Sequence, residues 1–155
     1  MIKIIDVTVR DGLQSFHKIL STKQRTKIVS LISTLGIKDI EIGSIVSDKV
    51  IPQMKSSIKV YQNSYKENKQ LNYYMLISNS YGINESMKNN IKHISFFTSP
   101  SDTFNLKNIN CSTNDSHFKI KEMKNKISND AYTRGYLSCI NECPYEGIIP
   151  IDKIL

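Results

Sequence analysis

The stretch Val7-Thr8-Val9-Arg10-Asp11-Gly12-Leu13-Gln14 decides the expected fold, because it ends the first apolar run of the chain. β-Branched residues dominate that run and favour a buried strand. Alternate side chains of a strand lie on opposite faces, so Asp6, Thr8 and Arg10 would share one face. A loop begins at Asp11, and parallel α/β folds bind ligands where strands end. The stretch therefore predicts a polar site, although an ordinary ion pair of Arg10 and Asp11 is the alternative.

Strand patterns and helix patterns alternate along the rest of the chain, which predicts a parallel α/β sheet. Further strands are expected at residues 37–43, 71–77, 93–98 and 132–139. Helices are expected after Ser21, over 56–65, over 81–92, after Ser112 and from Pro150. One helix thus separates each strand from the next, as in a βαβ repeat.

Two of the expected helices have clear end signals and apolar stripes. Ser21 with Gln24 and Ser112 with Asp115 fit capping boxes, and Gly36 suits the end of the first helix. The apolar spacing places Ile28, Leu31, Ile32 and Leu35 on one stripe of the first helix, and the helix after Ser112 carries Phe118, Met123 and Ile127.

The second expected strand carries acids on one face. A period of two places Asp39 and Glu41 opposite the apolar residues of that strand. Glu41 is therefore an inward acid, and the arginine that pairs with it would be Arg10 or Arg134. The fifth expected strand places three polar residues on one face: Arg134, Tyr136 and Ser138.

Length and charge limit the function classes. The 155 residues suffice for one domain with a sizeable core. A net charge of +7 would suit an anionic partner such as coenzyme A or nucleic acid. The basic residues are scattered, which favours a solvated surface and, with no binding motif, argues against nucleic acid. No apolar run reaches the ~20 residues of a membrane span, so no membrane partner is expected.

The cysteines indicate a reducing compartment. Cys111, Cys139 and Cys143 make an odd number, and the sequence begins without a secretory signal or transit peptide, so a cytoplasmic location is expected. A zinc site at Cys139 and Cys143 would need two more Cys or His ligands nearby, which the sequence lacks. Cys139 is expected to be a buried structural residue, and Cys143 a loop residue beside the ligand.

Four ordered blocks resemble the 3-hydroxy-3-methylglutaryl-CoA lyases, a family of metal-dependent TIM-barrel lyases related to acyl-CoA condensing enzymes. The first is Val-Arg-Asp-Gly-Leu-Gln at residues 9–14. The second, residues 41–54, begins Glu-Ile-Gly-Ser, and the third is Lys-Asn-Ile-Asn-Cys-Ser at 107–112. The fourth joins residues 134–139 to Cys-Pro-Tyr-Glu-Gly at 143–147. The resemblance covers residues 2–155.

The resemblance implies an α/β fold, the N-terminal five-strand portion of a (β/α)8 TIM barrel. A complete barrel typically needs ~250 residues, so residues 1–155 are expected to form a single, truncated barrel domain. The open sheet would expose two strand edges, which invite a second copy or a complementing chain.

The resemblance also assigns roles to individual residues. Asp11 matches a ligand of a divalent metal, Mg²⁺ or Mn²⁺, and Arg10 matches the arginine that stabilises an enolate. Glu41 matches a glutamate that orients that arginine. Contacts to an acyl-CoA substrate are expected from Gln14, His17, Lys18, Tyr136, Ser138 and Cys143.

The departures from the family pattern are as informative as the matches. The family's remaining metal ligands, a His-x-His pair on the seventh strand and a later Asn, and its cysteine in a glycine-rich loop have no counterpart in these residues. One carboxylate would hold Mg²⁺ weakly, so the metal is expected to be weak or absent in this chain alone.

Three functions are consistent with this pattern. The first is a lyase cleaving 3-hydroxy-3-methylglutaryl-CoA to acetyl-CoA and acetoacetate, for which Leu13 and the Cys-Pro-Tyr-Glu-Gly loop argue. The second is a condensing enzyme like homocitrate or isopropylmalate synthase. The third is a catalytically inactive relic, or a half-barrel that needs a second chain.

Overall fold

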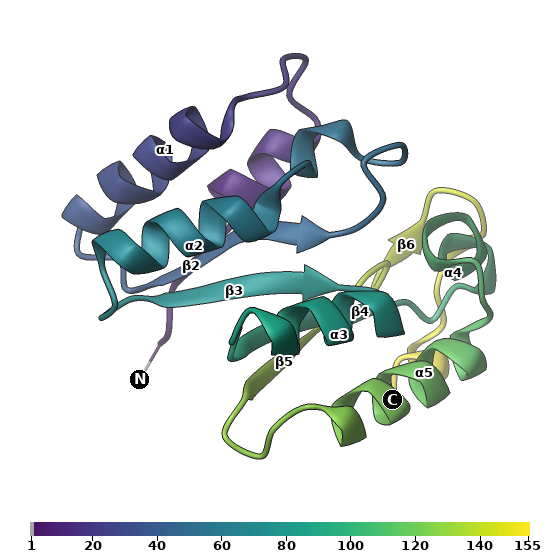
Figure 1. The fold of residues 1–155 in the computed structure, drawn as a ribbon. Coiled ribbons are helices and arrows are strands. Elements are labelled where there is room, and N and C mark those ends of the chain that lie inside the picture. Colours follow the sequence, from purple (N-terminus) through teal and green to yellow (C-terminus); the bar gives the residue numbers. More distant parts are fainter. Residues whose placement is uncertain (1) are drawn as a thin grey trace.

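Five parallel strands form a curved half-barrel sheet in the computed structural model, which describes residues 2–155 (Figure 1). The strands are β1 (Ile5–Asp6), β2 (Asp39–Ile45), β3 (Asn72–Ile77), β4 (His93–Thr98) and β5 (Tyr132–Leu137). They lie in the sheet in chain order, and every neighbouring pair is parallel. This is the order of the first five strands of a (β/α)8 barrel, as the sequence predicts.

The helices follow the strands and pack on one face of the sheet. They are α1 (Thr22–Thr34), α2 (Ser57–Glu67), α3 (Ser80–Lys88), α4 (Asp102–Ile109) and α5 (Thr113–Lys126). Three short turns, η1 (Thr8–Gly12), η2 (Pro52–Met54) and η3 (Ile151–Lys153), and a two-stranded hairpin, β6 (Glu142–Cys143) with β7 (Gly147–Ile148), complete the fold. Within residues 2–155, no helix is long and apolar enough to cross a membrane.

The two faces of the sheet differ in chemistry. The face toward the helices forms the hydrophobic core, which includes Ile40, Ile42, Tyr73, Met75, Ile77, Ile94 and Phe96. Strand periodicity gives the other face Asp39 and Glu41 on β2 and Arg134 on β5. In a closed barrel this polar face would line the interior, so the functional groups gather there.

The predicted helix ends are confirmed. Ser21 caps α1 and Ser112 caps α5, each in a complete capping box, with Gln24 and Asp115 as the reciprocal partners. Gly36 follows α1 with φ +79°, a left-handed backbone that glycine adopts without steric cost.

The first strand is much shorter than expected. Only Ile5 and Asp6 pair with β2, and the chain then coils into the turn η1. Ile2 and Ile4 are exposed, because β1 has one neighbouring strand and no helix covers its start. Arg10 therefore reaches the polar face from a helical turn, and the expected strand alternation through Asp6, Thr8 and Arg10 is wrong.

The apolar stripe predicted for α1 is also partly wrong. On α1 the buried residues are Arg25, Thr26, Val29 and Ile32, whereas Leu31 and Leu35 are exposed. On α5 Met123 is buried, Ile127 packs partly buried against the core and Phe118 is exposed. Apolar spacing alone could not decide which side of each helix faces the sheet.

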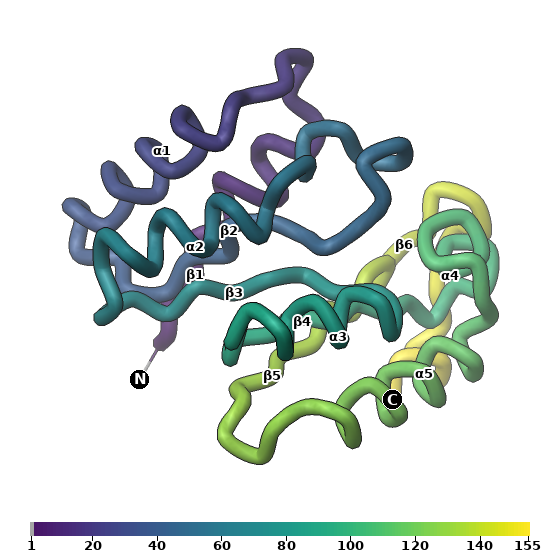
Figure 2. Tube along the Cα trace, in the orientation of Figure 1, coloured from purple at the N-terminus to yellow at the C-terminus, as the bar shows by residue number. Residues whose placement is uncertain are grey.

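The segment between β4 and α5 contains a helix that the sequence pattern did not predict. Ser101 caps α4 by accepting a hydrogen bond from the backbone N–H of Phe104 at 3.1 Å. Beyond β5 and the β6–β7 hairpin, only the short turn η3 forms where a helix from Pro150 was expected. Figure 2 shows this C-terminal segment, in yellow, beside α4, where the N–H of Thr103 donates to Glu146 at 2.7 Å.

The cysteines also depart from expectation. Cys139 is only partly buried and has φ +60°, whereas Cys111 and Cys143 are the buried cysteines. The prediction that Cys139 is a buried structural residue is therefore wrong. All three are free thiols.

Candidate active site at the carboxyl ends of the strands

A cavity of about 440 Å³ lies where strands β2 to β5 end on the polar side of the sheet. The turn η1 and helix α4 form its sides. Fifteen residues line it: Val7, Arg10, Asp11, Gln14, Ser44, Val46, Val50, Ile51, Leu76, Ser78, Phe97, Phe104, Asn108, Tyr136 and Ser138. Apolar walls with a few polar groups are typical of small-molecule sites.

The turn η1 presents Arg10 to this cavity. The N–H groups of Arg10, Asp11 and Gly12 all donate to the carbonyl of Val7, which closes the turn tightly. Val9 is fully buried in the core and anchors the turn against the sheet. Arg10 is only 8% exposed, so its guanidinium is held at the floor of the cavity.

Glu41 lies beneath Arg10 and is fully buried. It precedes a β-bulge, where the register of β2 against β3 shifts between Glu41 and Gly43. Bulges of this kind redirect side chains next to active sites. The carbonyl of the bulged residue Ile42 accepts a hydrogen bond from the Arg25 guanidinium at 3.0 Å, which fixes the bulge from the helix side.

Both carboxylate oxygens of Glu41 are occupied. One accepts from Nε of Arg10 in a close ion pair. The other accepts from Nη2 of Arg134 at 2.7 Å, the hydroxyl of Ser95 at 2.6 Å and the hydroxyl of Tyr136 at 3.1 Å. These five residues, Arg10, Glu41, Ser95, Arg134 and Tyr136, are called the carboxyl-end cluster below.

Within the carboxyl-end cluster one buried carboxylate faces two guanidinium groups, and the exposed Asp11 carboxylate beside the cluster pairs with Arg10. Tyr136 stacks beside both arginines, with its ring 5.3 Å from Arg10 and 4.4 Å from Arg134. Glu41 is fully buried and does not line the cavity, so it positions the arginines and is poorly placed to act as a base. The arrangement suits an anion that forms in the cavity above Arg10.

Asp11 is the only carboxylate that lines the cavity. Its side chain is 64% exposed and pairs with Nη1 of Arg10 at 2.8 Å. Residues 2–155 contain no group of three or more His, Cys, Asp or Glu residues that could hold a metal ion. One carboxylate does not make a site for Mg²⁺ or Mn²⁺, so a metal here would need ligands from outside these residues.

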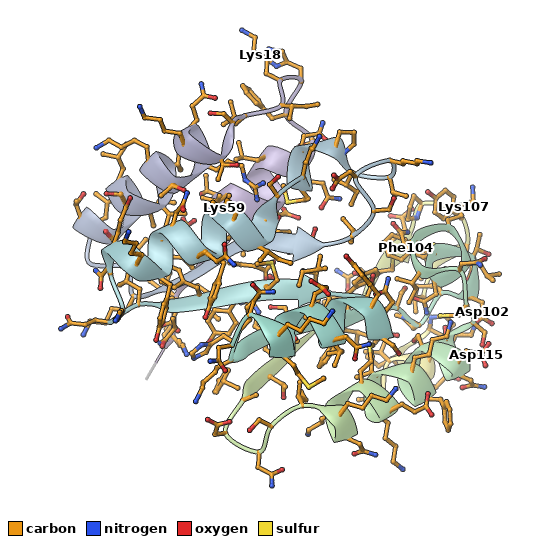
Figure 3. All side chains as sticks on the ribbon, in the orientation of Figure 1. Lys18, Lys59, Asp102, Phe104, Lys107 and Asp115 are labelled. Atoms are coloured by element: carbon orange, nitrogen blue, oxygen red, sulfur yellow. The ribbon has the colours of Figure 1, made fainter. Side chains whose placement is uncertain are left out.

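The cavity collects some of the residues predicted to bind a ligand and leaves others apart. Gln14, Tyr136 and Ser138 line it. His17 lies on the exposed loop after η1, where its ring packs 4.6 Å from Phe16, and Lys18 marks the tip of that loop in Figure 3. Cys143 lies elsewhere, buried beside Ser101.

Several residues in the cavity or packed beside its cluster were not predicted from the sequence. Phe104 and Asn108 come from the unexpected helix α4, so no pattern pointed to them. Ser95 and Phe97 share the polar face of β4, and a period of two along that strand could have found both. The burial of Arg25 was not predicted, because buried arginines without a carboxylate partner are rare. Burial lowers the pKa of its guanidinium to about 10.

A second cluster occupies the same face at the other end of the strands, and we call it the amino-end cluster: Lys3, Asp39, Tyr74, His93 and Tyr132. Lys3 contacts Asp39 and the hydroxyl of Tyr74, both at 2.9 Å. Burial raises the pKa of Asp39, but hydrogen bonds from Lys3 and Asn72 outweigh this and lower it overall. Burial, followed by the charge of Lys3, lowers the pKa of His93.

Comparisons of this chain with known proteins point to the same family. The family described as HMGL-like matches residues 1–155. The mitochondrial hydroxymethylglutaryl-CoA lyase of Macaca fascicularis is 36% identical over 154 residues, which are 99% of this chain and 47% of that protein. The 3-hydroxy-3-isohexenylglutaryl-CoA/hydroxymethylglutaryl-CoA lyase of Pseudomonas aeruginosa is 31% identical over 147 residues, 94% of this chain and 49% of that protein.

Solved structures of HMG-CoA lyases are also similar to this chain. An HMG-CoA lyase from Acinetobacter baumannii, in complex with coenzyme A and 3-methylmalate, superposes with a TM-score of 0.91 at 27% identity. The match covers 98% of this chain and 50% of that one. The chain thus spans about half the length of the relatives it matches.

Proposed function

Because the chain belongs to the HMGL-like family, we propose that it is part of a carbon–carbon lyase that cleaves 3-hydroxy-3-methylglutaryl-CoA to acetyl-CoA and acetoacetate. The observation that carries this proposal is the pairing of Arg10 with the fully buried Glu41 at the floor of the cavity. The lyase names of the relatives and the coenzyme A complex among the solved structures support the substrate class.

The proposed role of Arg10 follows from where charge develops. Loss of the 3-hydroxyl proton lets the bond between C2 and C3 break, and acetoacetate leaves with a new carbonyl. The electron pair of that bond moves onto the thioester as an enolate, which becomes acetyl-CoA when a proton is added at C2. A fixed guanidinium stabilises the enolate oxygen without having to reorganise. Arg10 is held in this way by Glu41, so its contribution is largest in the transition state.

The walls of the cavity supply recognition. Phe104, Phe97 and Leu76 offer apolar surface, and Ser138, Asn108 and Gln14 offer hydrogen-bonding groups. We assign the acyl chain and its thioester to this cavity. His17, Lys18 and Cys143 remain proposed substrate contacts that would require the loops to move, because none of the three lines the cavity as it stands.

Asp11 remains our proposed contribution to a divalent-metal site. It is exposed at the cavity rim and adjacent to Arg10, which is a suitable place for one oxygen ligand. Residues 2–155 contain no group of three or more His, Cys, Asp or Glu residues that could complete such a site, so no step of the reaction is assigned to a metal. We propose a cytoplasmic location; relatives described as cytoplasmic and as mitochondrial both match.

A second candidate is a half-barrel that works only with further strands. Within residues 2–155, β1 and β5 are the sheet edges, and each has an unpaired side. Strands from a second copy or from a complementing chain would satisfy these edges. A condensing enzyme of the same superfamily would use the same cavity and would differ in turning over a 2-oxo acid with acetyl-CoA.

Calorimetric titration of the chain with 3-hydroxy-3-methylglutaryl-CoA tests the proposed site. We expect saturable binding with a Kd of about 0.1–1 mM, the weak range for an open site. Ser138→Leu places a branched apolar side chain in the cavity and should abolish binding. Lys59→Met removes a charge on α2, away from the cavity, and should bind like the wild type (Figure 3). Equal binding by all three proteins would contradict the assignment of the ligand to this cavity.

A further inference from the structure

The hydroxyl of Ser44 is a buried polar group beside the cavity at the carboxyl ends of the strands. Ser44 is 2% exposed, and its Oγ has no hydrogen-bond partner among residues 2–155. The same residue lines the cavity. A buried hydroxyl without a partner costs stability, and native proteins keep few of them. Beside a cavity, a bound ligand can supply the missing partner.

The β-bulge of β2 brings Ser44 to the cavity. Ile42 packs in the core, so simple alternation along the strand would place Ser44 in the core as well. The register shift between Glu41 and Gly43 reverses this order. Ile45 therefore packs in the core, and Ser44 lines the cavity.

Gly43 makes this bulge possible. A Cβ at its position would clash with the side chain of Ser57 and would lie 2.9 Å from Nη2 of Arg25. The same nitrogen of Arg25 donates to the carbonyl of Ile42. Contacts from the helix side thus fix the bulge, and with it the placement of Ser44.

Ser44 lies beside the turn that carries Arg10. The turn η1 packs against β2, and Ser44 and Arg10 line the same cavity. On its other side Ser44 is paired with Leu76 of β3, an apolar residue of the cavity wall. Of these two neighbours only Arg10 attracts an anion, so a ligand oxygen that Ser44 binds fits best between Ser44 and Arg10.

We propose that Ser44 is a second oxyanion donor, whose O–H binds the same thioester oxygen as the Arg10 guanidinium. This inference rests on the proposed function, because the lyase reaction places negative charge on that oxygen as the enolate forms. The hydroxyl keeps its proton, so no further bond forms or breaks. Hydrogen bonds to charged groups are stronger than those to neutral groups, so Ser44 stabilises the enolate more than the neutral thioester.

Calorimetric titration of the native chain with two ligands tests this preference. Acetyl-CoA presents a neutral thioester carbonyl, whereas S-carboxymethyl-coenzyme A presents an anionic carboxylate near the same position. We expect Ser44→Ala to weaken binding of S-carboxymethyl-coenzyme A by about tenfold or more, and that of acetyl-CoA by about threefold. Equal weakening of both ligands, or no weakening, would overturn the proposal.

Folding stability distinguishes this role from a structural one. Because the Ser44 hydroxyl has no partner among residues 2–155, Ser44→Ala should keep or raise the urea midpoint. Thr26 on α1 provides a matched control, since its Oγ1 is also buried without a partner in that range but does not line the cavity. Thr26→Val should keep or raise the midpoint too and should bind both ligands as the wild type does. A lower midpoint for Ser44→Ala would assign its hydroxyl to the fold and overturn the proposal.

A probe without coenzyme A separates this proposal from the proposed function. In an NMR titration with acetate, the Nε–H signal of Arg10 should move saturably, and Ser44→Ala should need about tenfold more acetate. If neither coenzyme A ligand binds but acetate shows this difference, the substrate class is wrong and the oxyanion site stands. An Arg10 signal that does not move, or that responds equally in both proteins, would overturn the role of Ser44.

Discussion

The polar face of the sheet carries two clusters of similar composition, one at each end of the strands. Each has an acid from β2, a basic group from the N-terminal segment, and a tyrosine. The two acids, Asp39 and Glu41, are two residues apart on the same strand and point to the same side. The clusters differ in what surrounds them.

In the amino-end cluster aromatic rings enclose the charges. The ring of Tyr74 lies 5.0 Å from His93 and 5.9 Å from Tyr132, and Nζ of Lys3 lies 4.7 Å from the Tyr132 ring. In the carboxyl-end cluster two arginines surround Glu41, and Arg10 opens into the cavity. Similar side chains thus have different surroundings at the two ends of the half-barrel: aromatic rings at the amino end and a cavity at the carboxyl end.

Neutralising Glu41 and Asp39 in turn should give the largest difference in stability between the two clusters. Glu41→Gln removes the buried carboxylate that two guanidinium groups share and leaves Arg10 only the exposed Asp11. Loss of one partner of a buried ion pair costs about 3–5 kcal/mol. Asp39→Asn should cost about 1 kcal/mol or less, because the side chain of Lys3 is 43% exposed. Urea unfolding of both variants gives the free energies of unfolding. Equal losses would show that Glu41 is only another structural acid.

Arg10→Lys should separate catalysis from binding in a barrel completed by further strands. Lysine lacks the planar fork, so it cannot contact Glu41 and an enolate oxygen together. We expect kcat to fall by about 10²–10³, the scale for losing one oxyanion donor, while KM changes little. Lys3→Arg, in the amino-end cluster, should leave both constants unchanged. A variant at Arg10 that raises KM alone would assign Arg10 to ground-state binding.

Asp11→Asn should show a different pattern from Arg10→Lys. If Asp11 is a metal ligand in the completed barrel, its loss should weaken Mn²⁺ binding by at least about tenfold, the lower end of effects at metal sites. Turnover at saturating Mn²⁺ should fall less. Titration of Mn²⁺ against both variants distinguishes the metal ligand from the residue that stabilises the enolate. If Arg10→Lys lost the metal and Asp11→Asn kept it, the roles given to Arg10 and Asp11 would be wrong.

The smallest expected effect is a pH dependence from the amino-end cluster. The pKa of His93 is lowered in the folded protein, so the unfolded chain takes up its proton first as the pH falls. The stability from neutral His93 is therefore present above about pH 6.5 and declines as the pH falls below it. His93→Gln should flatten the change in urea midpoint between about pH 7 and 5. An unchanged slope would place the titrating group elsewhere.

The sequence predicts the sheet well, because strand patterns and capping boxes are local signals. Ser21 and Ser112 begin helices as expected, and Glu41 faces inward as its alternation predicts. Arg10 was expected to point inward for the wrong reason, since a turn and not a strand carries it. β1 ends early because the chain turns at Val7 into η1, where three N–H groups donate to the Val7 carbonyl, and strand alternation did not indicate this turn.

The parts that could not be predicted depend on packing between distant segments. Helix α4 has only 8 residues and buries Asn105, so it has no apolar stripe that would reveal it. Arg25 is buried on α1 because it bonds the carbonyl of Ile42 at the bulge, while Leu31 on another side of that helix is exposed. Phe104 could be assigned to the cavity only after the position of α4 was known.

The most direct test of the central claim is an NMR titration that follows the Nε–H groups of the arginines. The claim is that Glu41 holds Arg10 at the floor of a ligand cavity. Its buried ion pair should protect the Arg10 Nε–H from exchange, so the signal should be visible at neutral pH and move saturably with 3-hydroxy-3-methylglutaryl-CoA. Arg25, buried on the helix side, should not move. A stationary Arg10 signal at saturating ligand would contradict the account.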